Sequence, residues 1–224
     1  MLAIILAGFT NYLFRKQYHL SKPASLPEVH HHSYLLVLII GLVLGSIFFG
    51  TLNIRLSGVE GFSKSLIGGI AGAILLAEAF KKIVGVQGST GFYFIPGLCV
   101  MIIVGRIGCY LAGLPDYTFG IPTDTVFGVD FGDGLLRHPV QLYESFSMLV
   151  FLMILLFSYK SQQAFWIKNG FYLFVLFYAG QRFLWEFLKP YATLLAQLNL
   201  FHLLALLMIT YALLMLLSSR KSKQ

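Results

Sequence analysis

The chain has 224 residues, of which 58% are hydrophobic and only 11% are charged. Because a soluble globular domain carries about 25% charged residues, this composition excludes an ordinary soluble domain and indicates a membrane protein. The formal net charge of +7 comes without a basic stripe interleaved with aromatic residues between the apolar runs, so no nucleic acid partner is expected.

Charged residues separate the apolar runs, and the pattern predicts an all-α fold of about seven transmembrane helices. We expect one membrane domain over residues 1–224, with spans at 1–14, 34–54, 65–80, 92–112, 140–158, 170–188 and 194–217. The first and third are short, since crossing a bilayer takes about 20 helical residues. Positive charge follows the first run instead of preceding it, which predicts a retained helix and not a signal peptide.

Lysine and arginine predict the orientation of these helices. Alternate loops hold Arg15, Lys16, Lys22, Lys81, Lys82, Lys160, Lys168, Arg220, Lys221 and Lys223, whereas the opposite loops hold only Arg55, Lys64, Arg137 and Lys189. Because basic residues concentrate in cytoplasmic loops, the N-terminus is predicted to lie outside and the C-terminus in the cytoplasm. The long connection at 113–139 is then an extracytoplasmic loop, and loops of that length are usually functional.

Two arginines, Arg106 and Arg182, fall inside predicted spans near their outer ends. A charge within the bilayer costs about 2.5–3.5 kcal/mol on insertion scales, so such residues need a partner and usually have a function. Tyr178, Arg182 and Glu186 are spaced four apart and share one helical face. They predict an anion site in which Arg182 binds phosphate; the alternative is an Arg–Glu pair that only snorkels to the interface.

Arg106 lies in the tetrapeptide Gly105-Arg106-Ile107-Gly108, whose glycines would let a ligand or another helix come close. Two arginines at matching depth invite an anion unless carboxylates neutralise both, and lipid phosphate is the nearest anion.

A third motif reads Arg137-His138-Pro139-Val140-Gln141-Leu142-Tyr143-Glu144. The proline suits the first turn of a helix. His138, Gln141 and Glu144 are spaced three apart, which predicts one shared face at the outer mouth, with His138 as general base or hydrogen-bond donor. For Glu144 an alternative is a helix-start acid favoured by the helix dipole.

Together these motifs resemble the prolipoprotein diacylglyceryl transferase family, with order and spacing maintained over residues 68–187. The resemblance implies a seven-helix protein of the bacterial cytoplasmic membrane. It also implies transfer of a diacylglyceryl group from phosphatidylglycerol, or a similar anionic phospholipid, to the lipobox cysteine of a prolipoprotein, which binds through its signal peptide. It implies no metal or cofactor. The expected catalytic residues are Arg106, Arg182, Glu186 and His138, and the expected substrate-binding residues are Tyr178, Glu144, Gln141, Arg137, Gly68, Gly69, Gly105 and Gly108.

The chain departs from the family pattern at three positions. Ile67 stands where the family has His or Tyr, Cys109 where it has Asn, and Leu114 where it has Glu. Either other residues compensate, with His138, Asp116, Lys64 and Cys109 as candidates, or the acceptor is a different one. A lipid or anionic-solute binder or transporter of the same fold, without chemistry, is the alternative function.

Overall fold

The computed structural model describes residues 1–20 and 30–221, with side chains to residue 219. Four basic side chains used to predict the orientation, those of Lys22, Arg220, Lys221 and Lys223, lie outside the described part.

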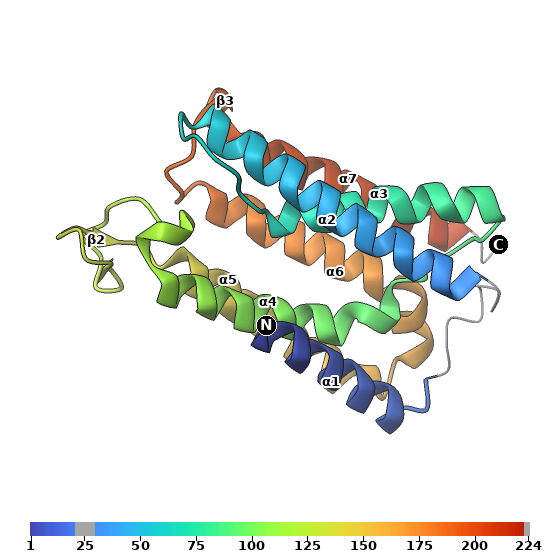
Figure 1. The fold of residues 1–224 in the computed structure, drawn as a ribbon. Helices are drawn as coiled ribbons and strands as arrows, with labels where there is room; N and C mark the ends of the chain where they lie inside the picture. Colours follow the sequence, from blue (N-terminus) through green and yellow to red (C-terminus); the bar gives the residue numbers. More distant parts are fainter. Residues whose placement is uncertain (21–29, 222–224) are drawn as a thin grey trace. The chain divides into compact units, whose positions relative to one another are not determined.

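The described residues form seven α-helices, joined by short 3₁₀ turns and two small hairpins (Figure 1). In chain order the elements are α1 (Leu2–Gln17), α2 (His31–Leu56), α3 (Leu66–Val84), η2 (Phe92–Phe94), α4 (Ile95–Ala112), η3 (Leu114–Asp116), β1 (Val129–Asp130), β2 (Leu136–Arg137), α5 (Val140–Tyr159), α6 (Gln163–Glu186), β3 (Thr193–Leu195), β4 (Leu198–Asn199) and α7 (Leu200–Lys221). The prediction of a helical membrane protein is confirmed in this coarse form.

Four of the described helical segments are long and apolar enough to cross a membrane. They are His31–Leu56, Phe92–Ala112, Val140–Tyr159 and Leu200–Ser219. Two predicted boundaries were wrong. The sixth helix begins at Gln163 and therefore includes Lys168, and the seventh begins at Leu200 because a β3–β4 hairpin occupies the preceding residues. Asn199 starts α7 by accepting hydrogen bonds from the backbone N–H groups of Phe201 and His202, at 2.9 and 3.0 Å.

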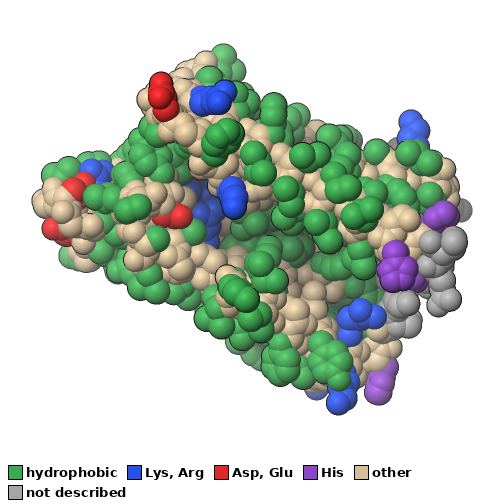
Figure 2. Space-filling model, in the orientation of Figure 1, with side chains coloured by type: hydrophobic (Ala, Val, Ile, Leu, Met, Phe, Trp, Pro, Cys, Tyr) green, Lys and Arg blue, Asp and Glu red, His purple; other side chains and the backbone are tan. Residues whose placement is uncertain are grey.

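Large apolar side chains lie on the outside of the helices. Ile4 of α1, Leu44 of α2, Phe157 of α5 and Leu207 of α7 are each more than half exposed. Figure 2 shows hydrophobic side chains covering most of the visible face. A water-soluble monomer rarely exposes such large apolar areas, so these surfaces are suited to lipid.

The chain forms two compact units. Unit 1 comprises Met1–Leu20 and Gly91–Pro190, and unit 2 comprises Ser21–Thr90 and Tyr191–Gln224. In unit 1, α1 packs on α4, α4 on α5 and α5 on α6. The side-chain oxygen of Asn11 on α1 accepts a hydrogen bond from the N–H of Gly97 (2.8 Å), which satisfies a free amide at the start of α4. The single membrane domain stays a prediction.

In unit 2, α3 packs closely on α2 and also contacts α7. A Cβ added to Gly45 would lie 2.4 Å from the carbonyl oxygen of Gly68, and one added to Gly68 would lie 2.7 Å from that of Gly45. Glycine is therefore required at both positions for the two backbones to approach. The Tyr211 hydroxyl donates to Glu78 Oε1 (2.7 Å) and ties α7 to α3.

The 113–139 connection is ordered by backbone pairing. β1 and β2 pair with Val129 opposite Arg137, and the N–H of Thr123 donates to the carbonyl of Leu136 (2.8 Å). The N–H of Ile121 donates to the carbonyl of Leu188 (2.7 Å), two residues beyond α6. The loop is thus fixed to the end of the helix that carries Arg182.

Candidate active site

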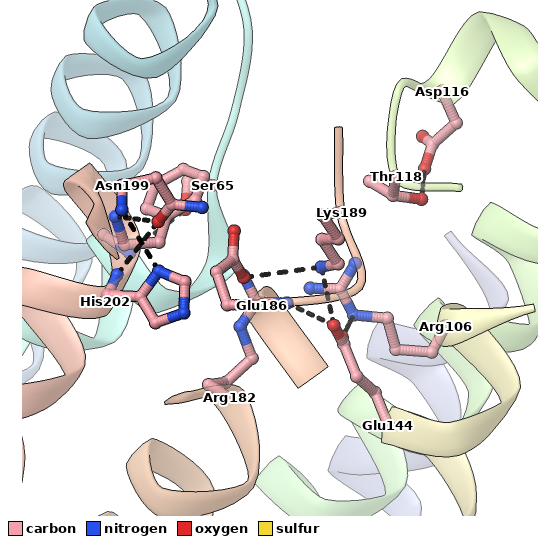
Figure 3. A network of polar contacts seen from close by, with 12 residues as sticks. Ser65, Arg106, Asp116, Thr118, Glu144, Arg182, Glu186, Lys189, Asn199 and His202 are labelled. Atoms are coloured by element: carbon pink, nitrogen blue, oxygen red, sulfur yellow. Dashed lines mark hydrogen bonds and ion pairs between the residues drawn. The ribbon is translucent and has the colours of Figure 1, made fainter. Parts of the chain in front are cut away.

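Five buried charged side chains of unit 1 form an ion cluster: Arg106, Glu144, Arg182, Glu186 and Lys189 (Figure 3). Glu144 lies at its centre. Its Oε2 contacts Nε of Arg106, and its Oε1 contacts both Nη1 of Arg182 and Nζ of Lys189, the last at 2.6 Å. One carboxylate therefore connects three cations.

Glu186 is the second carboxylate of the cluster. Its Oε2 lies 2.6 Å from Nη2 of Arg182 and 3.7 Å from Nζ of Lys189. The three cations and two carboxylates leave the cluster with a residual charge of +1. Such a cluster can attract one more negative charge.

Three successive helices supply these groups. Arg106 lies in the C-terminal half of α4, Glu144 in the second turn of α5, and Arg182 and Glu186 one turn apart near the end of α6. Lys189 follows three residues after Glu186. Because neighbouring helices run in opposite directions, the end of α4, the start of α5 and the end of α6 meet at the same depth. Mutual pairing makes five charges tolerable among apolar helices.

Arg106 keeps one side of its guanidinium unused. It contacts Glu144 through Nε, and within residues 1–20 and 30–221 no hydrogen bond reaches Nη1 or Nη2. A Cβ added to Gly105 or Gly108 would meet no atom within 4 Å, so α4 is not packed at these two positions, which lie on other faces of the helix than Arg106. A planar guanidinium edge with two donors is suited to binding phosphate oxygens.

Comparison with known proteins identifies the family. The family model described as prolipoprotein diacylglyceryl transferase matches residues 2–218. The chain belongs to this family. No solved structure matches it significantly.

Three similar relatives are each named phosphatidylglycerol–prolipoprotein diacylglyceryl transferase. The protein from Campylobacter jejuni subsp. jejuni strain 81-176 is 28% identical over 218 residues, covering 84% of this chain and 72% of the relative. The Geobacter sulfurreducens protein is 30% identical over 166 residues, covering 67% and 60%. The Bordetella parapertussis protein is 33% identical over 132 residues, covering 56% and 48%.

The structure changes how the two arginines of this family member are understood. The sequence predicts an anion clamp made of Arg106 and Arg182, on the condition that carboxylates do not neutralise both. Glu144 contacts both of them. Glu144 is also not a helix-start acid, because it lies beyond the first turn of α5 and is 0% exposed. Any anion must therefore bind to the residual charge of the cluster and not to two free arginines.

The predicted helical face shared by His138, Gln141 and Glu144 is wrong for His138, whereas Gln141 and Glu144 both lie buried in α5. α5 begins at Val140, so His138 lies in the paired loop, where its carbonyl accepts a hydrogen bond from the N–H of Gly120 (3.0 Å). Its ring Nδ1 lies 3.4 Å from the Tyr143 hydroxyl. Proline at the N-cap stops the helix from extending back to His138.

Arg137 also lies apart from the ion cluster contacts. Its Nε and Nη2 donate to Asp133 Oδ2 at 2.9 and 2.7 Å, and its guanidinium carbon lies 5.0 Å from the ring centre of Phe119. The hydrogen bond from Arg137 holds the pKa of Asp133 below its ordinary value. The structure thus gives Arg137 a role in ordering the loop, and substrate binding by it stays a prediction.

Two predicted binding residues are fully buried polar groups of unit 1. Tyr178, one turn before Arg182 on α6, and Gln141, one turn before Glu144 on α5, are both 0% exposed. Within the described part of the chain, neither the Tyr178 hydroxyl nor the Gln141 amide has a hydrogen-bond partner. Because buried polar groups in proteins are nearly always paired, the Tyr178 hydroxyl and the Gln141 amide are expected to pair with a bound ligand or water.

Gly68 and Gly69 belong to unit 2, where both face α2. A Cβ at Gly69 would lie 3.0 Å from the Leu42 carbonyl oxygen. Packing explains these two glycines, and a substrate contact by them stays a prediction.

Lys189 is the cluster residue that the sequence analysis missed, because it was counted only as a loop cation. The available signal was its spacing of three from Glu186, which extends the face of Tyr178, Arg182 and Glu186 by one turn. Among the residues proposed to compensate for the family departures, Lys64 is exposed and Cys109 is half-buried. Ile67, which is one of the departures, is fully buried. Asp116 accepts a hydrogen bond from Thr118 (2.6 Å).

Proposed function

We propose that this chain transfers a diacylglyceryl group from phosphatidylglycerol to the cysteine thiol of a prolipoprotein. The observation that carries the proposal is the unused Nη edge of Arg106, within a buried cluster of residual charge +1. A membrane protein with such a site can take an anionic headgroup from the bilayer. Family membership and the names of the relatives support this donor and acceptor.

The proposed reaction is a substitution at the glyceryl carbon that bears the phosphate. The cysteine thiolate attacks this carbon, the carbon–sulfur bond forms, and the carbon–oxygen bond to phosphate breaks. Glycerol phosphate leaves with the bonding electron pair and gains one negative charge. The thiol proton is taken by a base, for which His138 at the outer end of α5 is the predicted residue.

The ion cluster would act on the leaving group. Negative charge grows on the departing phosphate during the reaction, and a fixed cation stabilises that charge most in the transition state. Glu144 holds Arg106 by Nε and so fixes which guanidinium edge is presented. Glu186 and Lys189 hold the other end of the cluster in place.

The proposed setting is the cytoplasmic membrane of a bacterium, crossed by about seven helices. α1 would begin outside and α7 would end in the cytoplasm, as the distribution of basic residues predicts. The ion cluster would then lie near the outer surface, where the prolipoprotein's signal peptide brings its cysteine.

Complementation tests the proposal. The chain would be expressed in bacteria depleted of their own diacylglyceryl transferase, beside Arg106→Ala, Arg182→Ala and the exposed loop control Asp124→Asn. Lipidation of a reporter prolipoprotein would be followed by its mobility shift. We expect rescue by the wild type and by Asp124→Asn, and none by the two arginine variants.

Well-expressed wild-type protein that gives no lipidation would overturn the prolipoprotein acceptor. Rescue that survives both arginine substitutions would overturn the assigned role of the ion cluster.

A further inference from the structure

Gln141 is a buried polar residue that the ion cluster does not use. It is 0% exposed, and both its amide oxygen and its amide nitrogen lack a hydrogen-bond partner within the described residues. Leaving such a group unpaired costs about 1–3 kcal/mol. Because Gln141 lies beside the charged site, we expect its amide to form hydrogen bonds when a ligand binds there, which regains this free energy.

The neighbours of Gln141 on α5 show which way it faces. Ser145, one turn further along, donates through its hydroxyl to the carbonyl of Ile103 on α4 (3.1 Å). Because α4 and α5 run in opposite directions, the turn before Ser145 faces the turn of α4 after Ile103. Gln141 therefore faces the part of α4 that carries Arg106, with Gly105 and Gly108 on either side of it.

The charge and the hydrogen-bonding groups near Arg106 and Gln141 limit the chemical class of ligand that can bind there. Arg106 presents donors suited to a phosphate, and the residual positive charge of the cluster opposes a cationic headgroup such as an ethanolamine. A neutral amide offers one acceptor and two donors. A hydroxyl group can donate to the amide oxygen and accept from the amide N–H groups. A glycerol attached to the phosphate carries such hydroxyls.

We propose that Gln141 hydrogen-bonds the glycerol headgroup of the phospholipid and so selects phosphoglycerol over other phosphodiesters. The inference rests on the proposed function, because that function supplies phosphatidylglycerol as the occupant. It adds a residue that recognises the hydroxyls, beside the cations that recognise the phosphate.

The test is the binding of two short-chain lipids to the purified full chain in detergent, measured by calorimetry. Phosphatidylglycerol and phosphatidylethanol carry the same phosphodiester charge, but only the first has headgroup hydroxyls. We expect the wild type to prefer phosphatidylglycerol about tenfold or more. Gln141→Met should reduce that preference to about twofold or less by weakening phosphatidylglycerol binding alone.

Gln181→Met is the matched control, because Gln181 is also a buried amide of unit 1 without a partner in the described chain. It should keep the wild-type preference. Thermal unfolding without lipid separates a binding role from a structural one. Since the Gln141 amide makes no hydrogen bond to the described residues, Gln141→Met should unfold at the wild-type temperature or above it.

A preference that survives in Gln141→Met, or that Gln181→Met loses equally, would overturn the inference while leaving the transferase proposal intact. Wild-type protein that binds both lipids equally would also overturn it. Transfer to a prolipoprotein, assayed on the same preparation, reports separately on the proposed function. A protein without transfer that still selects phosphatidylglycerol through Gln141 would support the inference and contradict the transferase.

Discussion

Arg106 and Glu144 contact each other through a single guanidinium nitrogen, Nε, and within the described residues no hydrogen bond reaches the two terminal nitrogens of Arg106. The same carboxylate also contacts Arg182 and Lys189. Glu144 thus neutralises part of the positive charge and fixes the direction in which the rest is presented.

Arg106→Lys separates charge from geometry. A lysine can still pair with Glu144, but it has one ammonium group in place of separate Nε and Nη donors. We expect the rate of glycerol phosphate release to fall by about 100-fold or more, the cost of losing an oriented donor, with the unfolding temperature nearly retained. Arg106→Ala should lower both. A lysine variant with wild-type turnover would show that the Nη edge is not used.

Glu144→Gln leaves Arg106, Arg182 and Lys189 with Glu186 as the remaining carboxylate of the cluster. Removing one partner of a buried ion pair costs about 3–5 kcal/mol. We expect a clearly lower unfolding temperature in detergent, measured by loss of helical circular dichroism. Asp124→Asn, at an exposed loop position, is the control and should unfold with the wild type. Equal unfolding of the two variants would mean that Glu144 does not hold the cluster together.

Sequence patterns predicted the helical membrane class because they reflect local properties. Apolar runs between charges give the helices, and a spacing of four gives the Arg182–Glu186 pair, confirmed at 2.6 Å. The position of Arg106 in the C-terminal half of its helix was likewise a matter of local spacing. Each of these depends on residues close together in the chain.

What the sequence did not predict depends on packing between helices. Nothing in the spacing of α5 indicates that Glu144 meets α4 on one side and α6 on the other. His138 was misplaced because proline was assigned to the first helical turn, whereas it is the N-cap. The β3–β4 hairpin before α7 was taken as helix because its leucines continue the apolar run.

Lys189→Met tests the residual positive charge. Without the ammonium group, two arginines face two carboxylates and the cluster becomes neutral. We expect the KM for phosphatidylglycerol to rise about tenfold with a smaller change in kcat, since long-range attraction to the anion is lost. Lys189→Arg should restore the wild-type KM. A methionine variant with unchanged KM would contradict the role of the residual charge.

Asp133 and Arg137 provide a pH-dependent contact in the 113–139 loop. The hydrogen bond from Arg137 lowers the pKa of Asp133, so the folded loop favours the charged carboxylate. A lowered pKa contributes stability that is present above the ordinary pKa of an aspartate and is lost as the pH falls through the lowered value. The contact is therefore intact at neutral pH and released in acid.

Amide hydrogen exchange over residues 129–138 measures this contact, with wild type and Asp133→Asn compared at each pH. At neutral pH the variant should exchange faster, because Arg137 loses its acceptor and the β1–β2 hairpin opens more often. Below the lowered pKa the two proteins should exchange at the same rate, because the wild-type carboxyl is then also neutral. A difference that persists in acid would show that Asp133 orders the hairpin through the hydrogen bond that its Oδ1 accepts from the N–H of Leu135, and not through its charge.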